Sequence, residues 1–188
     1  MNGEKFKELD DAYIAYNNED VDTAIKLYES AARRGSILAI IQLIYIYGNY
    51  HANNNRFDFW KNKIIKLSEY DNIAQFGLAN FYFEGVFGRV DKKAGMDNLL
   101  RSANSGYADA QYQLADLHCS GLYDAIVSTE YASYWLRRAY KNRHPGAYYE
   151  ISCYYGNNGK NKKSEELLKK SAKLGFGQAQ DILGEGKY

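Results

Sequence analysis

The sequence has little of what several large classes of protein require. Only two of its 188 residues are cysteine, too few for a disulfide framework. The formal net charge of +1 and the pI near 7.7 provide no basic footprint for a nucleic acid backbone. No apolar run approaches the roughly 20 residues of a membrane span. The polar, acidic start over residues 1–11 lacks the pattern of a secretory signal. We therefore expect a folded, cytoplasmic chain that neither spans a membrane nor binds nucleic acid.

The sequence does contain a repeat. Five times an alanine is followed four residues later by leucine or isoleucine, and the alanines lie 35, 36, 37 and 32 residues apart. Tyrosine or histidine stands eight residues after the first four alanines. The pairs are Ala39/Leu43, Ala74/Leu78, Ala110/Leu114, Ala147/Ile151 and Ala179/Leu183, and the later positions are Tyr47, Tyr82, His118 and Tyr155. A fixed period of this length indicates supersecondary units that form a core only when they stack.

Glycine marks a boundary between two helices in three of the repeats. Gly35, Gly106 and Gly175 each stand four residues before a repeat alanine and follow an apolar stretch with helical spacing. Because glycine adopts the left-handed conformation at a helix C-terminus without a Cβ clash, each predicts the end of one helix and the start of the next. Tyr70 and Arg143 occupy this position in the other two repeats.

The same signals give a map of helix hairpins. A helices, which carry the alanines, are expected near 4–17, 37–48, 72–84, 108–120, 145–156 and 177–184. B helices are expected near 21–34, 57–69, 91–104, 128–142 and 161–173. No segment alternates with period two, so no sheet is predicted. The sequence thus predicts an all-α right-handed α-α superhelix, a solenoid of about five helix-hairpin repeats, as a single continuous array over 1–188.

The repeat pattern G-x3-A-x3-L-x3-Y-x2-G resembles the Sel1-like repeat (SLR) family, a relative of the tetratricopeptide repeats. The third repeat matches best, with Gly106, Ala110, Leu114, His118 and Gly121. The resemblance spans about residues 10–184 and implies the same solenoid fold. The sequence departs from the family pattern at Tyr70 and Arg143, and it lacks the cysteine pair that some members carry within each repeat.

No set of residues indicates an active site, a cofactor or a metal. His51, His118 and His144 have no nucleophile motif or paired ligand nearby, and His and Cys never fall at ligand spacing. We expect His118 to be a core residue, or one in the seam between helices, that replaces tyrosine, with metal ligation as the alternative. Cys119 and Cys153 are expected to be free thiols, because packed helix axes lie about 8–10 Å apart and a disulfide needs α-carbons within about 7 Å. The sequence predicts a protein that is not an enzyme.

The resemblance to tetratricopeptide arrays implies that the A helices line a concave surface that binds a protein or peptide. The residues two and six positions after each repeat alanine would point into it. An aromatic row flanked by amide and acid groups is typical of a protein-binding groove. The alternative is that these rings only pack against neighbouring repeats. The expected partner-binding residues at these two positions are Ile41, Tyr45, Phe76, Asn80, Tyr112, Asp116, Tyr149 and Cys153, and Glu84, Asp109 and Gln178 are expected to border them.

Three functional hypotheses follow. The first is an adaptor or scaffold that holds a protein or peptide partner, the second a bacterial immunity protein that neutralises a toxin, and the third a hydrolase. Charge differs between the ends: residues 1–22 hold seven carboxylates against two lysines, whereas 160–173 hold six lysines against two glutamates. This asymmetry predicts either a dipolar array that orients a partner or two solvated end faces.

Overall fold

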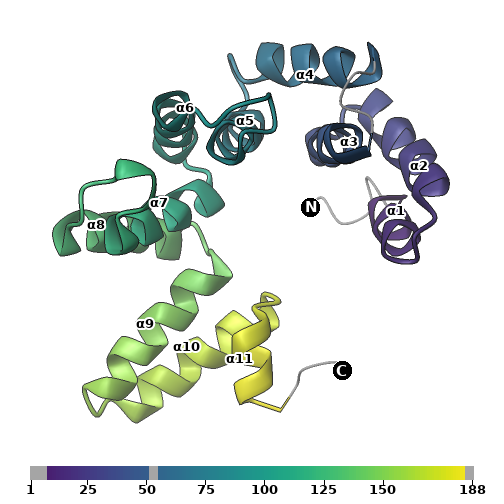
Figure 1. The fold of residues 1–188 in the computed structure, drawn as a ribbon. Coiled ribbons are helices and arrows are strands. Elements are labelled where there is room, and N and C mark those ends of the chain that lie inside the picture. The colour runs from purple at the N-terminus through teal and green to yellow at the C-terminus, as the bar shows by residue number, and fades with distance from the viewer. Residues whose placement is uncertain (1–7, 51–54, 185–188) are drawn as a thin grey trace. The chain divides into compact units, whose positions relative to one another are not determined.

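A computed structural model describes residues 8–50 and 55–184 of the chain (Figure 1). These residues form eleven α-helices and one short 3-10 helix, without a strand, so the prediction of an all-α fold is confirmed. The helices are α1 (Glu8–Asn17), α2 (Val21–Arg33), α3 (Ile37–Tyr50), α4 (Asn55–Leu67), α5 (Asn72–Glu84), α6 (Lys92–Asn104), α7 (Ala108–Ser120), η1 (Leu122–Asp124), α8 (Thr129–Lys141), α9 (Pro145–Asn157), α10 (Asn161–Lys173) and α11 (Gly177–Ile182).

The odd-numbered helices are the predicted A helices and the even-numbered ones the predicted B helices. Most ends agree with the prediction within two residues. Helix α3 was expected to end at Gly48 but continues to Tyr50, since glycine inside a helix weakens it without ending it. The expected start of the first helix at residue 4, together with His51, lies outside the described residues.

The turns between B and A helices use the left-handed backbone that the glycine pattern predicts. Gly35, Gly106 and Gly175 have φ of 96°, 94° and 91°. Arg143 adopts the same region, with φ of 63°, although its Cβ makes this conformation costly by about 1 kcal/mol. The turn at Tyr70 has no left-handed residue.

The repeat alanines lie where the helices pack most closely. All five are completely buried, and Leu43 and Leu114 are as well. Small side chains let neighbouring helices approach, while the larger residue one turn along fills the space beside them. The predicted role of the alanine register in the core is therefore confirmed.

The chain divides into two compact units, residues 1–98 and residues 99–188, and the division falls inside α6. The core of the first unit includes Leu43, Ile44, Ile64 and Phe81. The second unit buries a separate group, Leu99, Leu114, Leu117, Trp135 and Leu167. A single continuous array over 1–188 stays a prediction.

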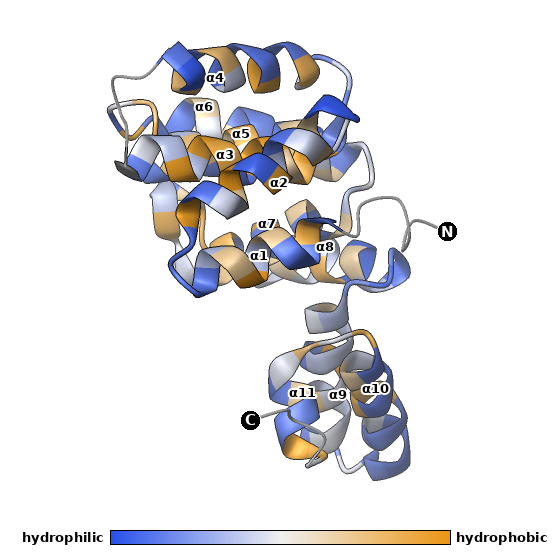
Figure 2. Cartoon of the chain, turned by 90° about the vertical axis from the view of Figure 1, so that its right-hand side faces the viewer, coloured by the Kyte–Doolittle hydropathy of each residue, from blue (hydrophilic) through white to orange (hydrophobic). Residues whose placement is uncertain are grey.

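Hydropathy differs sharply between helices (Figure 2). Helix α3 is largely apolar, whereas α10 is mostly hydrophilic and buries only Leu167, Ser171 and Ala172. Among the described residues, none of the helices combines the length and the apolar character that a membrane crossing requires. The apolar residues instead serve the contacts between helices.

Candidate functional site

Tyr112 on α7 packs against the start of α9 in the second unit. Its ring stacks on His144, with ring centroids 4.2 Å apart and planes 19° apart. A Cβ at Gly146 would come within 2.8 Å of the Tyr112 Cζ atom, so the glycine makes room for the ring. Burial raises the pKa of Tyr112 to about 12, and the nearby Glu150 and Asp116 act in the same direction.

His144 connects this contact to the end of the helix. Its Nδ1 accepts a hydrogen bond from the Ala147 backbone N–H at 3.3 Å, which caps α9. Its Nε2 lies 3.4 Å from Asp109 Oδ1. Burial lowers the pKa of His144, while the Asp109 carboxylate opposes that shift. The neutral imidazole therefore carries its proton on Nε2, where it can donate to Asp109.

Tyr149 on α9 packs against the start of the next A helix, α11, as Tyr112 packs against the start of α9. Its ring lies 5.2 Å from that of Phe176, the residue that precedes α11. A hydrogen bond with Cys153 raises the pKa of Tyr149, and burial and the nearby Glu150 act in the same direction. Both tyrosines remain partly exposed. The rings thus take part in packing between repeats and still present an edge to solvent.

Carboxylates surround these two tyrosines. Asp116 and Glu150 are exposed, and the Asp109 side chain is 47% exposed. We call Asp109, Tyr112, Asp116, Tyr149 and Glu150 the acidic aromatic face of the second unit. The sequence analysis had included all of these except Glu150, which stands three positions after its repeat alanine.

The five predicted residues of the first unit lie on α3 and α5. A Cβ at Gly77 would come within 2.6 Å of Ile41, so Ile41 packs onto α5. The ring of Tyr45 meets that of Phe81 edge to face at 5.0 Å. Phe76 and Asn80 are partly buried, and only Glu84 is exposed. The five predicted residues of the second unit show the same burial, with four partly buried and one, Asp116, exposed.

Charge is segregated between the two kinds of helix. Within their described bounds, the A helices α1, α3, α5, α7, α9 and α11 contain no lysine or arginine, and their charged side chains are acidic apart from the titratable His118. Every B helix contains at least two lysines or arginines. The signal is present in the sequence, but a whole-chain net charge of +1 conceals it.

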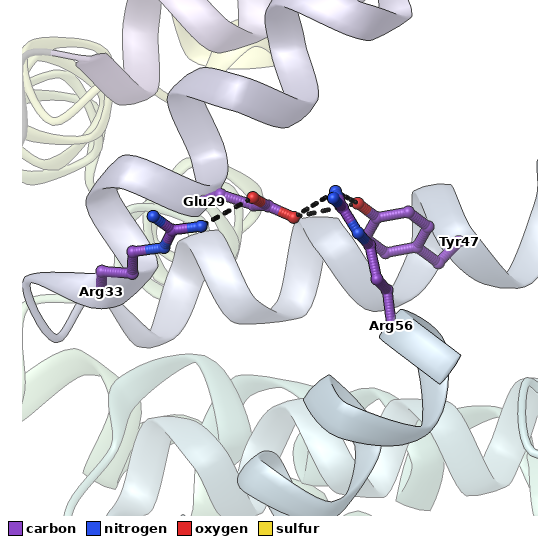
Figure 3. A network of polar contacts seen from close by, with 4 residues as sticks. All are labelled: Glu29, Arg33, Tyr47 and Arg56. Carbon is purple, nitrogen blue, oxygen red and sulfur yellow. Dashed lines mark hydrogen bonds and ion pairs between the residues drawn. The ribbon is translucent and has the colours of Figure 1, made fainter. Parts of the chain in front are cut away.

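A basic and aromatic pocket of about 230 Å³ lies between the B helices α2 and α4 of the first unit. Glu29 occupies its centre, between Arg33 at 3.2 Å and Arg56 at 2.9 Å, and accepts a hydrogen bond from the Tyr47 hydroxyl at 3.1 Å (Figure 3). The carboxylate side chain is only 14% exposed. Both arginines are therefore paired with one carboxylate from within the fold.

The remaining titratable candidates do not assemble into a metal site. Among the described residues, no group of three or more His, Cys, Asp and Glu side chains could hold an ion. His118 is partly buried, and its Nδ1 lies 2.8 Å from the Ile126 carbonyl oxygen. Cys119 and Cys153 are both free.

Alternating helices with small residues at their contacts define the class of α-solenoid repeat proteins. The family model described as Sel1 repeat matches residues 18–36, 72–107, 108–144 and 145–176, which is more than half of the chain. The chain belongs to the Sel1 repeat family. The unmatched stretch 37–71 contains Tyr70, where the family glycine is missing.

A curated relative is similar over much of the chain. The exopolysaccharide production negative regulator of Rhizobium leguminosarum bv. viciae is 29% identical over 156 residues, which cover 72% of this chain and 56% of the regulator. This chain therefore spans little more than half the length of that relative.

Two solved structures share the fold. A protective antigen of uropathogenic Escherichia coli, which displays an SLR fold, matches with a TM-score of 0.60 and 21% identity over 97% of this chain and 41% of its own. A Sel1 repeat protein from Oxalobacter formigenes matches with a TM-score of 0.63 and 22% identity over 87% and 49%. These likenesses establish the fold alone.

Proposed function

We propose that this protein is a scaffold that binds a protein or peptide partner through its A helices, and that the acidic aromatic face of the second unit is the main contact. The observation that carries the proposal is the lack of lysine and arginine in these helices, together with three carboxylates around two partly exposed tyrosines. Tyrosine is among the residues enriched at protein interfaces and their energetic centres.

The charge of this face suggests the chemistry of the partner. Lysine or arginine side chains would meet the carboxylates of Asp109, Asp116 and Glu150. The neighbouring repeat holds both rings in place, so little side-chain entropy is lost when a partner binds. We therefore expect a partner segment with exposed basic residues.

The relatives support an interaction role in general terms. Repeat solenoids present extended surfaces to partners, and the regulator from Rhizobium acts, by its name, on exopolysaccharide production. Neither its name nor those of the solved structures favours the immunity-protein or the hydrolase hypothesis, and both stay predictions.

Affinity capture with paired baits tests the proposal. The baits are the unchanged chain, the variant Asp116→Lys/Glu150→Lys and the control Glu165→Lys/Glu166→Lys, which alters charge equally on the exposed face of α10. Captured proteins identified by mass spectrometry should be lost with the first variant and kept with the control. A partner retained by both variants would exclude the acidic aromatic face as its binding site.

A further inference from the structure

In the second unit, exposed apolar residues gather on the B helix α8 and on the connector that precedes it. These residues, which we call the apolar patch, come from the connector after α7 and from the first half of α8, and each is about half exposed or more. They are Leu122 (56%), Ile126 (70%), Val127 (66%), Tyr131 (54%) and Tyr134 (49%). Several large exposed apolar side chains so close together in the chain are typical of an interaction surface.

The connector that carries this patch is tied to α7. The His118 ring lies 2.8 Å from the Ile126 carbonyl oxygen, and the Ser128 N–H donates to the His118 carbonyl at 3.0 Å. Ser128 then caps α8 by accepting from the Tyr131 N–H. The apolar side chains are therefore presented by a backbone that is held at both ends.

Beside the patch runs a groove of about 510 Å³, lined by Leu100, His118, Glu130, Tyr131, Tyr134 and Trp135. Most of this lining is apolar, and Trp135, which is 6% exposed, is buried beneath it. The volume is within the range of sites that hold an organic group or a few side chains.

A second groove of about 550 Å³ shares Glu130 and Tyr134 with the first and contains Arg137, Arg138 and Lys141. Arg138 donates to the Tyr134 hydroxyl at 2.9 Å and lies over the rings of Tyr134 and Trp135. Among the described residues, no carboxylate forms an ion pair with these three cations. Glu130, the one acid in the lining, already accepts from the Ser128 hydroxyl at 2.8 Å.

From this arrangement we infer that the two adjoining grooves of α8 form a second binding site, for an acidic segment of a partner protein that carries aliphatic or aromatic side chains. The apolar side chains enter the groove above Trp135, and the carboxylates of the segment meet Arg137, Arg138 and Lys141. Charge complementarity selects the acidic partner, and the recessed apolar groove requires the anchoring side chain.

A comparison with the first unit shows what distinguishes the grooves of α8 from the equivalent surface of α4. Glu29 stands six residues before Gly35, and Leu100 stands six residues before Gly106, so the two occupy equivalent repeat positions. In the first unit the carboxylate of Glu29 forms ion pairs with both neighbouring arginines. In the second unit Leu100 lines the groove and leaves the cations for a partner.

Fluorescence anisotropy with the whole chain tests the site. The probe is a short fluorescein-labelled peptide with a Leu-Phe-Leu core between runs of glutamate. One comparison peptide has lysine in place of glutamate, and another has alanine in place of the core. The acidic apolar probe should bind at least about tenfold more tightly than either comparison peptide. Equal binding of all three would overturn the proposal.

Two variants should weaken binding of the probe by about tenfold or more: Arg137→Glu/Arg138→Glu and Leu100→Glu. Leu100→Met, which conserves volume, should bind as the unchanged chain does. Phe59→Ala/Lys63→Glu changes the equivalent surface of α4 and should also keep the affinity. Melting curves by circular dichroism check that the variants are folded. If Leu100→Glu melts at a lower temperature than the unchanged chain, the test rests on Arg137→Glu/Arg138→Glu. Full affinity in the arginine variant would overturn the site.

Three further outcomes would assign the grooves elsewhere or overturn the proposal. Binding of phosphatidylserine vesicles that is lost in the arginine variant, without binding of the probe, would indicate a membrane. Concentration-dependent self-association lost in the same variant would indicate a second copy of the chain. Tighter binding of the probe to Asp116→Lys/Glu150→Lys would place it on the acidic aromatic face, because that variant removes the repulsion between the face and the glutamates of the probe. Retained affinity in that variant supports the α8 site and does not depend on the function proposed for the A helices.

Discussion

Helices α4 and α8 carry the same local motif, and the two units use it differently. In each helix an exposed ring precedes a buried tryptophan, and a cation follows three residues later: Phe59, Trp60 and Lys63 in α4, and Tyr134, Trp135 and Arg138 in α8. The rings of each pair meet at about a right angle, at 4.8 and 5.0 Å. Both cations lie over the tryptophan, at 5.1 and 5.3 Å.

The difference comes from the preceding B helix. Helix α2 supplies Glu29 to the first site, where it holds two arginines and the buried hydroxyl of Tyr47. Helix α6 supplies Leu100 to the second site, and the residue equivalent to Tyr47 is His118. A polar network therefore stabilises the first unit. The second unit has an apolar groove beside cations that form no ion pair within the described residues. These two differences, Leu100 for Glu29 and His118 for Tyr47, distinguish an internal support from a candidate docking surface.

The two tryptophans should be equally important for stability. Trp60→Ala and Trp135→Ala remove buried rings, and each should lower the free energy of unfolding by about 3–5 kcal/mol because the cavities cannot fully collapse. Urea unfolding followed by circular dichroism measures the loss. A cost below about 1 kcal/mol for either variant would show that the two motifs are not structurally equivalent.

Exchanging the residues that distinguish the sites should exchange their properties. Glu29→Leu should lower the free energy of unfolding by about 1–2 kcal/mol, because the buried Tyr47 hydroxyl loses an acceptor. It should also give α4 affinity for the acidic apolar probe, since Arg33, Arg56 and Lys63 lose their internal carboxylate. Glu29→Gln is the control, which keeps the shape and an acceptor. If Glu29→Leu gains no affinity in anisotropy titrations, neutralisation is not what separates the two sites.

The stability of the protein should depend on pH through His144, which lies in the second unit. The folded state lowers the pKa of His144, so the unfolded state binds more protons and stability falls as pH drops below about 6.5. Protonation of Nδ1 would also remove the acceptor that caps α9. The melting temperature should be lower at about pH 5.5 than at about pH 7.5, and the difference should shrink in His144→Asn, which retains a capping side chain. An unchanged difference in this variant would assign the pH dependence to other groups.

The exposed rings should matter least for folding. Phe59→Ala and Tyr134→Ala should each change the free energy of unfolding by about 0.5 kcal/mol or less, because both rings are about half exposed or more. Only Tyr134→Ala should weaken binding of the acidic probe. A large loss of stability in Tyr134→Ala would make its ring a packing element, like that of Tyr112.

The sequence predicted the fold well where the signal is local. Helical periodicity and the glycines at 35, 106 and 175 place most helix ends within two residues, because both features depend on the backbone of a single turn. The prediction was less complete for the A-helix face. Tyr112 and Tyr149 pack on the next repeat and stay partly exposed, and their role in binding a partner stays a prediction. Spacing places a ring on a helix face but does not say what covers it.

The sequence by itself determined the Sel1-like repeat, the alternation of A and B helices and the buried alanines, because periodic burial must be encoded residue by residue in the chain. Which charges are neutralised was decided only by the tertiary structure. Glu29 and Arg56 meet although 27 residues separate them, whereas no acid in the part of the chain that the structure describes forms an ion pair with Arg137 or Lys141. Ion pairs and grooves depend on side chains that different helices bring together, and a pattern along one helix cannot show which residue faces it from the next.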